Sequence, residues 1–324
     1  MSNAEEIRNI YKDATKELFK HFRKKFQRRK VIANDVDDIW SIDLVEMPKE
    51  WINDNNGYKY ILNVVDVFSK YAWSIELKNK NARDMVYAFK VIFSQGRLPN
   101  NIWVDSGKEF YNSSVKKLLD SLEINIYSTY GEHKSAVVER FNRTLKNMMY
   151  PALTINNNHK WVDILDELIE TYNNKKHSSI GMTPSEASKE ENFTKVYKKL
   201  YENYYNQEVD KPKLKLGDRV RISKVKGTFE KGYLPNWSEE IFKIKEVLIT
   251  KPITYKLEDM MEDEVKGSFY EQEIQKTSQK EDVMFVEKIL KRRKRKGIKE
   301  VFVSYVGWPS KFNNWIPEDN ILEN

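Results

Sequence analysis

Three acidic residues stand where carboxylates can act together. Asp43 lies in the alternating run IWSIDLVEM, Asp105 ends the short apolar run NIWVD, and Glu139 lies near the start of VVERFNRTLKN. Carboxylates that converge repel one another unless cations neutralise them, and hard oxygen ligands suit Mg²⁺ or Mn²⁺. Two such ions about 3.5–4 Å apart activate a nucleophilic oxygen and stabilise a leaving oxygen in phosphoryl transfer. One acid alone is more often structural, so the prediction depends on all three converging.

The segment that carries Glu139 has the pattern of an amphipathic helix. An apolar stripe recurs at helical spacing, formed by Val138, Phe141, Leu145 and Met148. A second face carries Glu139, Asn142, Arg143 and Lys146. An ordinary helix with one Glu–Arg pair would show the same pattern. What favours chemistry is the acid's place beside basic residues and after two aspartates at predicted strand ends.

The elements that must position these acids can be read in order. Residues 39–47 alternate and are rich in β-formers, and 58–79 read as a hairpin broken near Phe68-Ser69-Lys70. A helix, a strand ending at Asp105, a helix at 111–122, a further strand and two helices follow. This order predicts a mixed α/β sheet flanked by helices. Strand ends and helix starts at one edge of such a sheet are where α/β proteins assemble sites.

Charge and composition limit the class of protein. Lys and Arg number 56 against 49 Asp and Glu, for a net charge of +7. Residues 20–30 hold seven basic residues and no acid, and 291–296 read KRRKRK. Such blocks favour a polyanion partner, although solvated charge or a nuclear-import signal would look the same. With no cysteine, disulfides and Cys-ligated zinc are excluded. No apolar run approaches the ~20 residues that span a bilayer, so we expect an intracellular protein without a membrane partner.

Several strings together resemble one family. IDLVEM, VVDVFSKYAW, VDSGKEF, VVERFNRTLKN and YNNKKHSSIGMTPSEA are similar to the core of retroviral-type integrases over residues 35–190. The likeness is greatest to integrases of Maverick/Polinton-type self-synthesising DNA transposons and virophages. The resemblance implies a ribonuclease-H-like fold in which Asp43, Asp105 and Glu139 are the catalytic D,D,E triad and hold two Mg²⁺ or Mn²⁺ ions. The Asp105–Glu139 spacing is slightly shorter than in retroviral enzymes, which indicates a shorter loop.

The resemblance also implies contacts with the DNA end along the helix of Glu139. The matching positions in this sequence are Ser135, Asn142, Arg143 and Lys146. Arg143 and Lys146 follow the glutamate by one and two helical turns, where they would reach phosphates. An N-terminal zinc site with two His and two Cys, present in retroviral integrases, is not formed here, since only His21 precedes the core.

The region after the core is predicted to be β-rich. A polar, aromatic linker leads to LKLGDRVRISKVKG and three further short strands, as in a small barrel. GDRVRI resembles the SH3-like C-terminal domain of retroelement integrases. Arg219, Arg221 and Lys224, on an edge, would then hold DNA backbone. A β scaffold with solubilising charge is an equal alternative.

The C-terminal segment resembles a chromodomain. FVEKIL, a hairpin around KGIKE with KRRKRK in its turn, YVGWP and a closing helix at NNWIPEDNI carry the likeness. Chromodomains hold methyl-lysine in an aromatic cage by cation–π attraction. The cage positions fall at Met284, Tyr305 and Trp308, with Met in place of the usual first aromatic. The alternative for this module is binding of DNA or RNA.

The sequence therefore predicts a multidomain protein. The expected parts are a basic helical arm at 1–38, an α/β ribonuclease-H-like core at 39–190, a linker at 191–212, an all-β SH3-like domain at 213–277 and a chromodomain-like module at 278–324. The function expected from the resemblance is DNA integration in the host nucleus, by a homo-multimer that engages element-end DNA, target DNA and, through the chromodomain, a histone tail. A ribonuclease-H-like nuclease that never joins DNA and a domesticated chromatin-binding protein are the alternatives.

Overall fold

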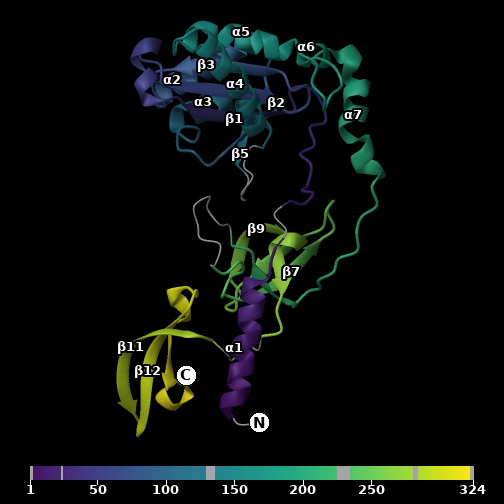
Figure 1. Cartoon of the computed structure of the whole chain (residues 1–324). Helices are drawn as coiled ribbons and strands as arrows, with labels where there is room; N and C mark the ends of the chain where they lie inside the picture. The colour runs from purple at the N-terminus through teal and green to yellow at the C-terminus, as the bar shows by residue number, and fades with distance from the viewer. Residues whose placement is uncertain (1–2, 23–24, 129–135, 225–233, 280–283, 322–324) are drawn as a thin grey trace. The chain divides into compact units, whose positions relative to one another are not determined.

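The computed structural model describes residues 3–22, 25–128, 136–224, 234–279 and 284–321. The chain divides into two compact units, one formed by residues 30–208 and the other by 1–29 together with 209–324. No helix in the described ranges is long and apolar enough to cross a membrane. Figure 1 labels the elements named below.

A five-stranded mixed sheet forms the centre of the unit 30–208. Its order is β3-β2-β1-β4-β5, with β1 antiparallel to β2, β2 antiparallel to β3, and β1, β4 and β5 mutually parallel where they pair. The strands are β1 (Ile39–Glu46), β2 (Tyr60–Asp66), β3 (Ala72–Leu77), β4 (Asn101–Val104) and β5 (Asn125–Ser128). The order of strands and helices along the chain is the one the sequence patterns predicted.

Helices cover both faces of this sheet (Figure 1). Helices α2 (Ala82–Phe93) and α3 (Ser113–Ser121) pack on one face around Trp40, Leu62 and Phe89. Helices α4 (Ala136–Ile155) and α5 (Val162–Asn173) pack on the other face. Strands β1, β2 and β3 have buried side chains on both faces, because alternate side chains point to opposite faces of the sheet. The Asn81 and Asn112 side chains cap α2 and α3 by accepting backbone N–H groups of their first turns.

Most of the predicted linker, up to residue 208, belongs to the unit 30–208 and is largely helical. After the short α6 (Pro184–Ala187), helix α7 (Phe193–Asn206) buries Val196, Leu200 and Tyr201 in a cluster with residues 31–36. The Tyr201 hydroxyl accepts the Ala33 N–H at 2.9 Å. Residues 30–38, expected in the arm, therefore pack here, and the unit extends past both boundaries drawn from sequence.

A second five-stranded sheet, fully antiparallel, has the order β10-β6-β7-β8-β9. Its strands are β6 (Arg219–Ile222), β7 (Phe242–Leu248), β8 (Thr254–Glu258), β9 (Glu264–Tyr270) and β10 (Ile274–Lys276). In the described residues β9 and β10 are opposite edges and do not pair, so the structure shows a β-rich sheet and no closed barrel.

The N-terminal helix packs with this C-terminal unit, which the sequence did not predict. Helix α1 spans Asn3–Phe19 and buries Leu18. The Trp237 indole donates to the Lys20 carbonyl at 2.7 Å, and Thr277 Oγ1 donates to Glu17 Oε2 at 2.5 Å. The predicted arm is thus divided between the two units.

A three-stranded antiparallel sheet ends the chain, in the order β11-β12-β13. Its strands are β11 (Val286–Arg295), β12 (Ile298–Tyr305) and β13 (Asn314–Pro317). The hairpin around KGIKE is present. Two expectations were wrong: residues 291–295 of KRRKRK lie in β11 and not in the turn, and residues 314–317 form a strand where a closing helix was expected, followed only by a 3₁₀ turn at Glu318–Asn320.

Candidate active site

Asp43 lies near the end of β1 with both carboxylate oxygens hydrogen-bonded. The Leu44 N–H donates to Oδ1 at 2.9 Å, and Asn142 Nδ2 of helix α4 donates to Oδ2 at 2.6 Å. Burial raises the pKa of Asp43, the two hydrogen bonds oppose that rise, the charge of Asp105 adds to it and the charge of Lys146 lowers it. The carboxylate is therefore held in one orientation, beside the charges of Asp105 and Lys146.

Asp105 reaches the same sheet edge. Strands β1 and β4 are parallel and Ser41 pairs with Trp103, so Asp43 and Asp105 both lie two residues beyond that pair. The Gly107 N–H donates to Asp105 Oδ1 at 3.0 Å. A Cβ at position 107 would fall 2.8 Å from the Glu109 carboxyl carbon and 2.9 Å from Asp105 Oδ1. Two carboxylates therefore approach this glycine closely, and a side chain at position 107 would displace them.

Helix α4 brings the third predicted acid to this region. Glu139 is an exposed residue in the first turn of α4, one turn before Asn142. Within the described residues, no three Asp, Glu or His side chains are grouped closely enough to hold a metal ion. The structure thus brings Asp43, Asp105 and Asn142 together and does not gather Glu139 into a three-acid cluster. The oxygen donors of Asp43 and Asp105 are those that a hard divalent cation prefers, so this pair fits Mg²⁺ or Mn²⁺.

The predicted DNA contacts on α4 differ in their surroundings. Arg143 and Lys146 are exposed, and the charge of Lys146 acts on Asp43. Asn142 has partners within the protein on both sides of its amide, Asp43 and Asn63. Ser135 lies outside the described residues.

The three basic residues predicted on an edge of the sheet β6–β10 are not equally accessible. Arg221 is only 1% exposed, and its guanidinium donates to the Ser238 and Glu239 carbonyls, to Glu17 and to Gln279. Its expected place on an exposed edge was wrong, because these acceptors enclose it. Arg219 is half-buried, and it donates to the Gln279 carbonyl at 3.1 Å. Lys224 forms an ion pair with Glu239 and keeps 42% of its side chain exposed.

The three cage positions of the chromodomain-like sheet form one cluster. Met284 and Trp308 pack against the small core formed by Val301, Val303 and Tyr305. The Tyr305 hydroxyl donates to Asn314 Oδ1 at 2.7 Å, and the Trp308 ring meets Phe312 edge-on with centroids 5.0 Å apart. The positions predicted from sequence are therefore adjacent, with Tyr305 inside the small core.

One group of polar residues was missed. Asn63 and Ser74 continue the hydrogen-bond chain behind Asn142, and the only signal was an Asn inside the apolar run YILNVVD. Asp66 is fully buried, accepts the Ser69 N–H and hydroxyl, and pairs with Arg97 Nη2 at 3.1 Å. Burial raises the pKa of Asp66, and Arg97 opposes this rise. Its role is structural, as hydrogen bonding at a turn would suggest.

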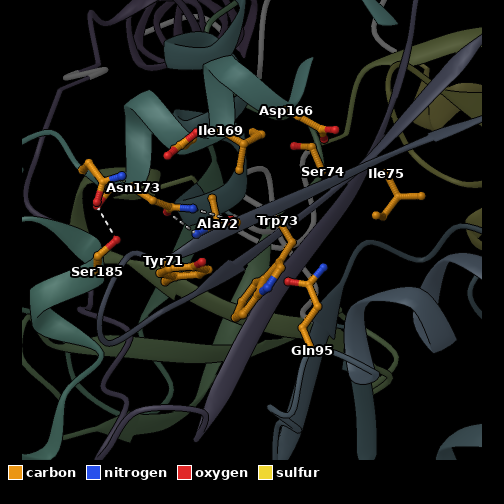
Figure 2. Close-up of a pocket in the computed structure, with 12 residues that line it drawn as sticks. Tyr71, Ala72, Trp73, Ser74, Ile75, Gln95, Asp166, Ile169, Asn173 and Ser185 are labelled. Atoms are coloured by element: carbon orange, nitrogen blue, oxygen red, sulfur yellow. Dashed lines mark hydrogen bonds between the residues drawn. The ribbon is translucent and has the colours of Figure 1, made fainter. Parts of the chain in front are cut away.

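A pocket of about 390 Å³ is lined by residues of β3 and α5, and Asp43, Asp105 and Glu139 are not among its lining residues (Figure 2). Its wall includes Trp73 and Ser74 of β3, Gln95, and Asp166 and Ile169 of α5 (Figure 2). Asn173 at the end of α5 is tied to β3, since its side chain exchanges hydrogen bonds of 2.9 Å with the Ala72 backbone. Ser74 connects this pocket to Asp43 through the hydrogen bonds of Asn63 and Asn142.

Two family descriptions match this chain. Residues 33–130 match the integrase core domain, and residues 284–324 match the chromo (chromatin organisation modifier) domain. A transposon-derived protein of Caenorhabditis elegans, F54H12.3, is 34% identical over 192 residues, which are 58% of this chain and 63% of that protein. The Gag-Pol polyprotein of avian reticuloendotheliosis virus is 29% identical over 133 residues, 40% of this chain and 11% of the polyprotein.

Similarity to a solved structure supports the fold. The intasome of simian T-cell lymphotropic virus, solved with the PP2A regulatory subunit B56 gamma, contains a chain that aligns with 79% of this chain over 83% of its own, with a TM-score of 0.51 and 14% identity. The matches to the nematode and viral proteins each span less than two thirds of those proteins' lengths. The two family matches show a segment that matches the integrase core domain, with relatives among retroviral and transposon-derived proteins, followed by a C-terminal segment that matches the chromodomain.

Proposed function

We propose that this protein is a DNA integrase, a polynucleotidyl transferase that trims the 3′ ends of element DNA and joins them to target DNA. In trimming, a water oxygen attacks a phosphodiester phosphorus and a DNA 3′-hydroxyl leaves. In joining, that 3′-hydroxyl attacks a target phosphodiester in line, and a target 3′-hydroxyl leaves. One P–O bond forms and one breaks in each step, so no further energy source is needed.

The observation that carries the proposal is the convergence of Asp43, Asp105 and helix α4 at one sheet edge. Asp43 is hydrogen-bonded to α4 through Asn142, and its pKa responds to the charges of Asp105 and Lys146. We propose that Asp43, Asp105 and Glu139 hold two Mg²⁺ or Mn²⁺ ions, which would activate the attacking oxygen and stabilise the leaving one. Arg143 and Lys146, exposed on the same helix, would bind the phosphates of the DNA end.

The C-terminal modules would position the complex. We propose that the antiparallel sheet β6–β10 is the counterpart of an SH3-like domain, with Arg219 and Lys224 on DNA backbone. The chromodomain would bind chromatin through a histone tail, with Met284, Tyr305 and Trp308 as its methyl-lysine contacts. Because two DNA ends must be brought to one target, we propose a homo-multimer acting in the host nucleus. We also propose that the element encoding this protein is of the Maverick/Polinton type.

A strand-transfer assay tests this function. Purified protein is mixed with a labelled, pre-trimmed duplex end, a plasmid target and Mg²⁺ or Mn²⁺. We expect labelled joined plasmid that disappears with Glu139→Gln or with EDTA. Cleavage without joining would favour a ribonuclease-H-like nuclease. Tight DNA binding without any metal-dependent product would favour a domesticated chromatin-binding protein, and full activity of Glu139→Gln would contradict the triad.

A further inference from the structure

A row of three polar side chains crosses the central sheet at one level. Asp43 of β1 pairs with Asn63 of β2, and Asn63 pairs with Ser74 of β3. Directly opposed residues of antiparallel strands point to the same face. The neighbours of Asn63 on this face, Ile61 and Val65, are buried in the apolar layer under α4 and α5. Asn63 is itself fully buried, and Ser74 is 6% exposed.

Hydrogen bonds connect this row to helix α4 in one direction. Ser74 Oγ donates to Asn63 Oδ1 at 2.5 Å, and Asn63 Nδ2 donates to Asn142 Oδ1 at 2.7 Å. Asn142 Nδ2 then donates to Asp43 Oδ2 at 2.6 Å. The chemistry of the groups dictates this direction. An ionised carboxylate only accepts, so Asn142 turns its NH₂ to Asp43 and its oxygen to Asn63, and Asn63 must then donate.

The position of Asn63 is unfavourable unless these bonds form. A buried amide without partners is costly, and a β-branched residue would suit this strand and this apolar layer better. Asn63 has both amide ends occupied, one by Ser74 and one by Asn142. If Asn63 served only to stabilise the sheet, a hydrogen bond with Ser74 would be enough. The third bond, to a helix residue that itself contacts Asp43, extends the pair to the candidate active site.

We propose that Asn63 and Ser74 are positioning residues for Asp43, acting through Asn142. This inference rests on the proposed function, in which Asp43 holds a metal ion. With the Leu44 N–H on Oδ1 and Asn142 on Oδ2, each oxygen of Asp43 keeps a lone pair for a cation. Without Asn63, the Asn142 amide loses the partner that sets its orientation and can present its oxygen to Asp43, which would repel the carboxylate.

The outer end of this chain of hydrogen bonds lies at a pocket wall. Ser74 lines the pocket between β3 and α5 (Figure 2). Ser74→Ala therefore removes one hydroxyl at the pocket wall without placing a larger group in the core. It is the milder variant if Asn63→Val, which removes both bonds of the amide, does not fold. Ser41→Ala is a matched control, because Ser41 is a fully buried serine of β1 whose hydroxyl has no hydrogen-bond partner among the described residues.

The first readout is structural. Crystal structures of the full chain with Asn63→Val and with Ser74→Ala should show the Asn142 amide turned away from its place or no longer donating to Asp43. In Ser41→Ala the Asn142–Asp43 hydrogen bond should be unchanged. An Asn142 side chain that keeps its orientation in both Asn63→Val and Ser74→Ala would overturn the proposal.

The second readout is the affinity for Mn²⁺, measured from the electron paramagnetic resonance signal of the free ion. Partners behind a metal ligand typically change affinity by about 10- to 100-fold. We expect Asn63→Val to weaken Mn²⁺ binding in that range, Ser74→Ala by less, and Ser41→Ala not at all. In an Asn142→Ala background, Asn63→Val should cause no further loss, since its effect passes through Asn142. Equal losses in both backgrounds would overturn the proposal.

The experiments distinguish failure of the proposed integrase function from failure of the proposed positioning role. A wild-type protein that binds no Mn²⁺ and joins no DNA would overturn the integrase function, and the crystal structures would still decide whether Asn63 orients Asn142. A wild-type protein that joins DNA, with Asn63→Val equal to it in Mn²⁺ affinity and in the Mg²⁺ dependence of joining, would uphold the function and overturn the positioning role.

Discussion

Asn142 Nδ2 donates a hydrogen bond of 2.6 Å to Asp43 Oδ2, which joins helix α4 to strand β1 at the candidate active site. Asn142 stands three residues after Glu139, so this bond also determines where the first turn of α4 lies relative to Asp43. The DNA contact predicted for Asn142 stays a prediction. Its amide already has a partner at each end, so we expect its substitution to act first on the carboxylate.

Two aspartates of neighbouring strands, half-buried Asp43 and fully buried Asp66, should respond oppositely to the same substitution. Asp43→Asn should abolish joining and leave stability nearly unchanged, because its carboxylate serves metal binding. Asp66→Asn should destabilise the unit 30–208 by about 1–3 kcal/mol, since it removes a buried acceptor from Ser69 and Arg97 while Arg97 keeps Asp37 as a partner, and it should leave the remaining folded protein active. Urea unfolding and the strand-transfer assay measure the two effects. Equal losses of activity per folded molecule would contradict this division.

Basic residues on α4 should contribute to DNA affinity through phosphates. Arg143→Ala and Lys146→Ala should each weaken binding of the DNA end and reduce the slope of log K against log salt by about one. Lys90 is an exposed residue of α2, a helix on the opposite face of the sheet, so Lys90→Ala is the control. Fluorescence anisotropy across a salt series measures the slopes. If neither α4 variant changed the slope of log K against log salt, the phosphates of the DNA end would bind at other residues.

Gly107 should be needed for activity more than for folding. In Gly107→Ala the new Cβ meets the Asp105 and Glu109 carboxyl groups, which can turn aside at little cost to stability. Displacement of Asp105 should nevertheless lower joining by about 10- to 100-fold, as loss of support for a metal ligand typically does. Joining rates against Mg²⁺ concentration test this, with exposed Ser106→Ala as the control. A variant as active as the wild type would show that Asp105 does not need its present orientation.

Glu240 should make the stability of the unit 1–29 and 209–324 depend on pH. Burial, with the nearby charge of Asp259, raises the pKa of Glu240 to about 7, and Lys311 opposes this. The folded state thus binds a proton that the unfolded state, with a pKa near the ordinary value of 4.5, has released, so stability falls as pH rises from 4.5 to 7. Glu240→Gln should raise the melting temperature at pH 8, by about 2–4 °C for each kcal/mol gained, and change it little at pH 4.5. Calorimetry at both pH values measures this, and an equal shift at both would exclude titration of Glu240 as the cause.

The sequence by itself determined the order of elements and the candidate acids. Strand and helix periods of about two and 3.6 residues are local properties of the chain, so β1 to β5 and the helices between them could be read directly. Asp43 and Asp105 could be assigned to one edge because parallel strands end at the same side of a sheet. The hairpin of the chromodomain was equally readable, although its basic residues proved to lie in a strand.

Only the tertiary structure decided which side chains find which partners. Arg221 looked like a DNA contact on a short strand, but acceptors from α1 and from residues 238–239 enclose it. Helix α7 looked like a linker, but it completes a core with residues 31–36. Asn63 looked like one polar residue in an apolar strand, and its meaning came from Ser74 on one side and Asn142, 79 residues away, on the other. Periodicity is written within a few residues, whereas hydrogen-bond partners depend on packing between segments far apart in the chain.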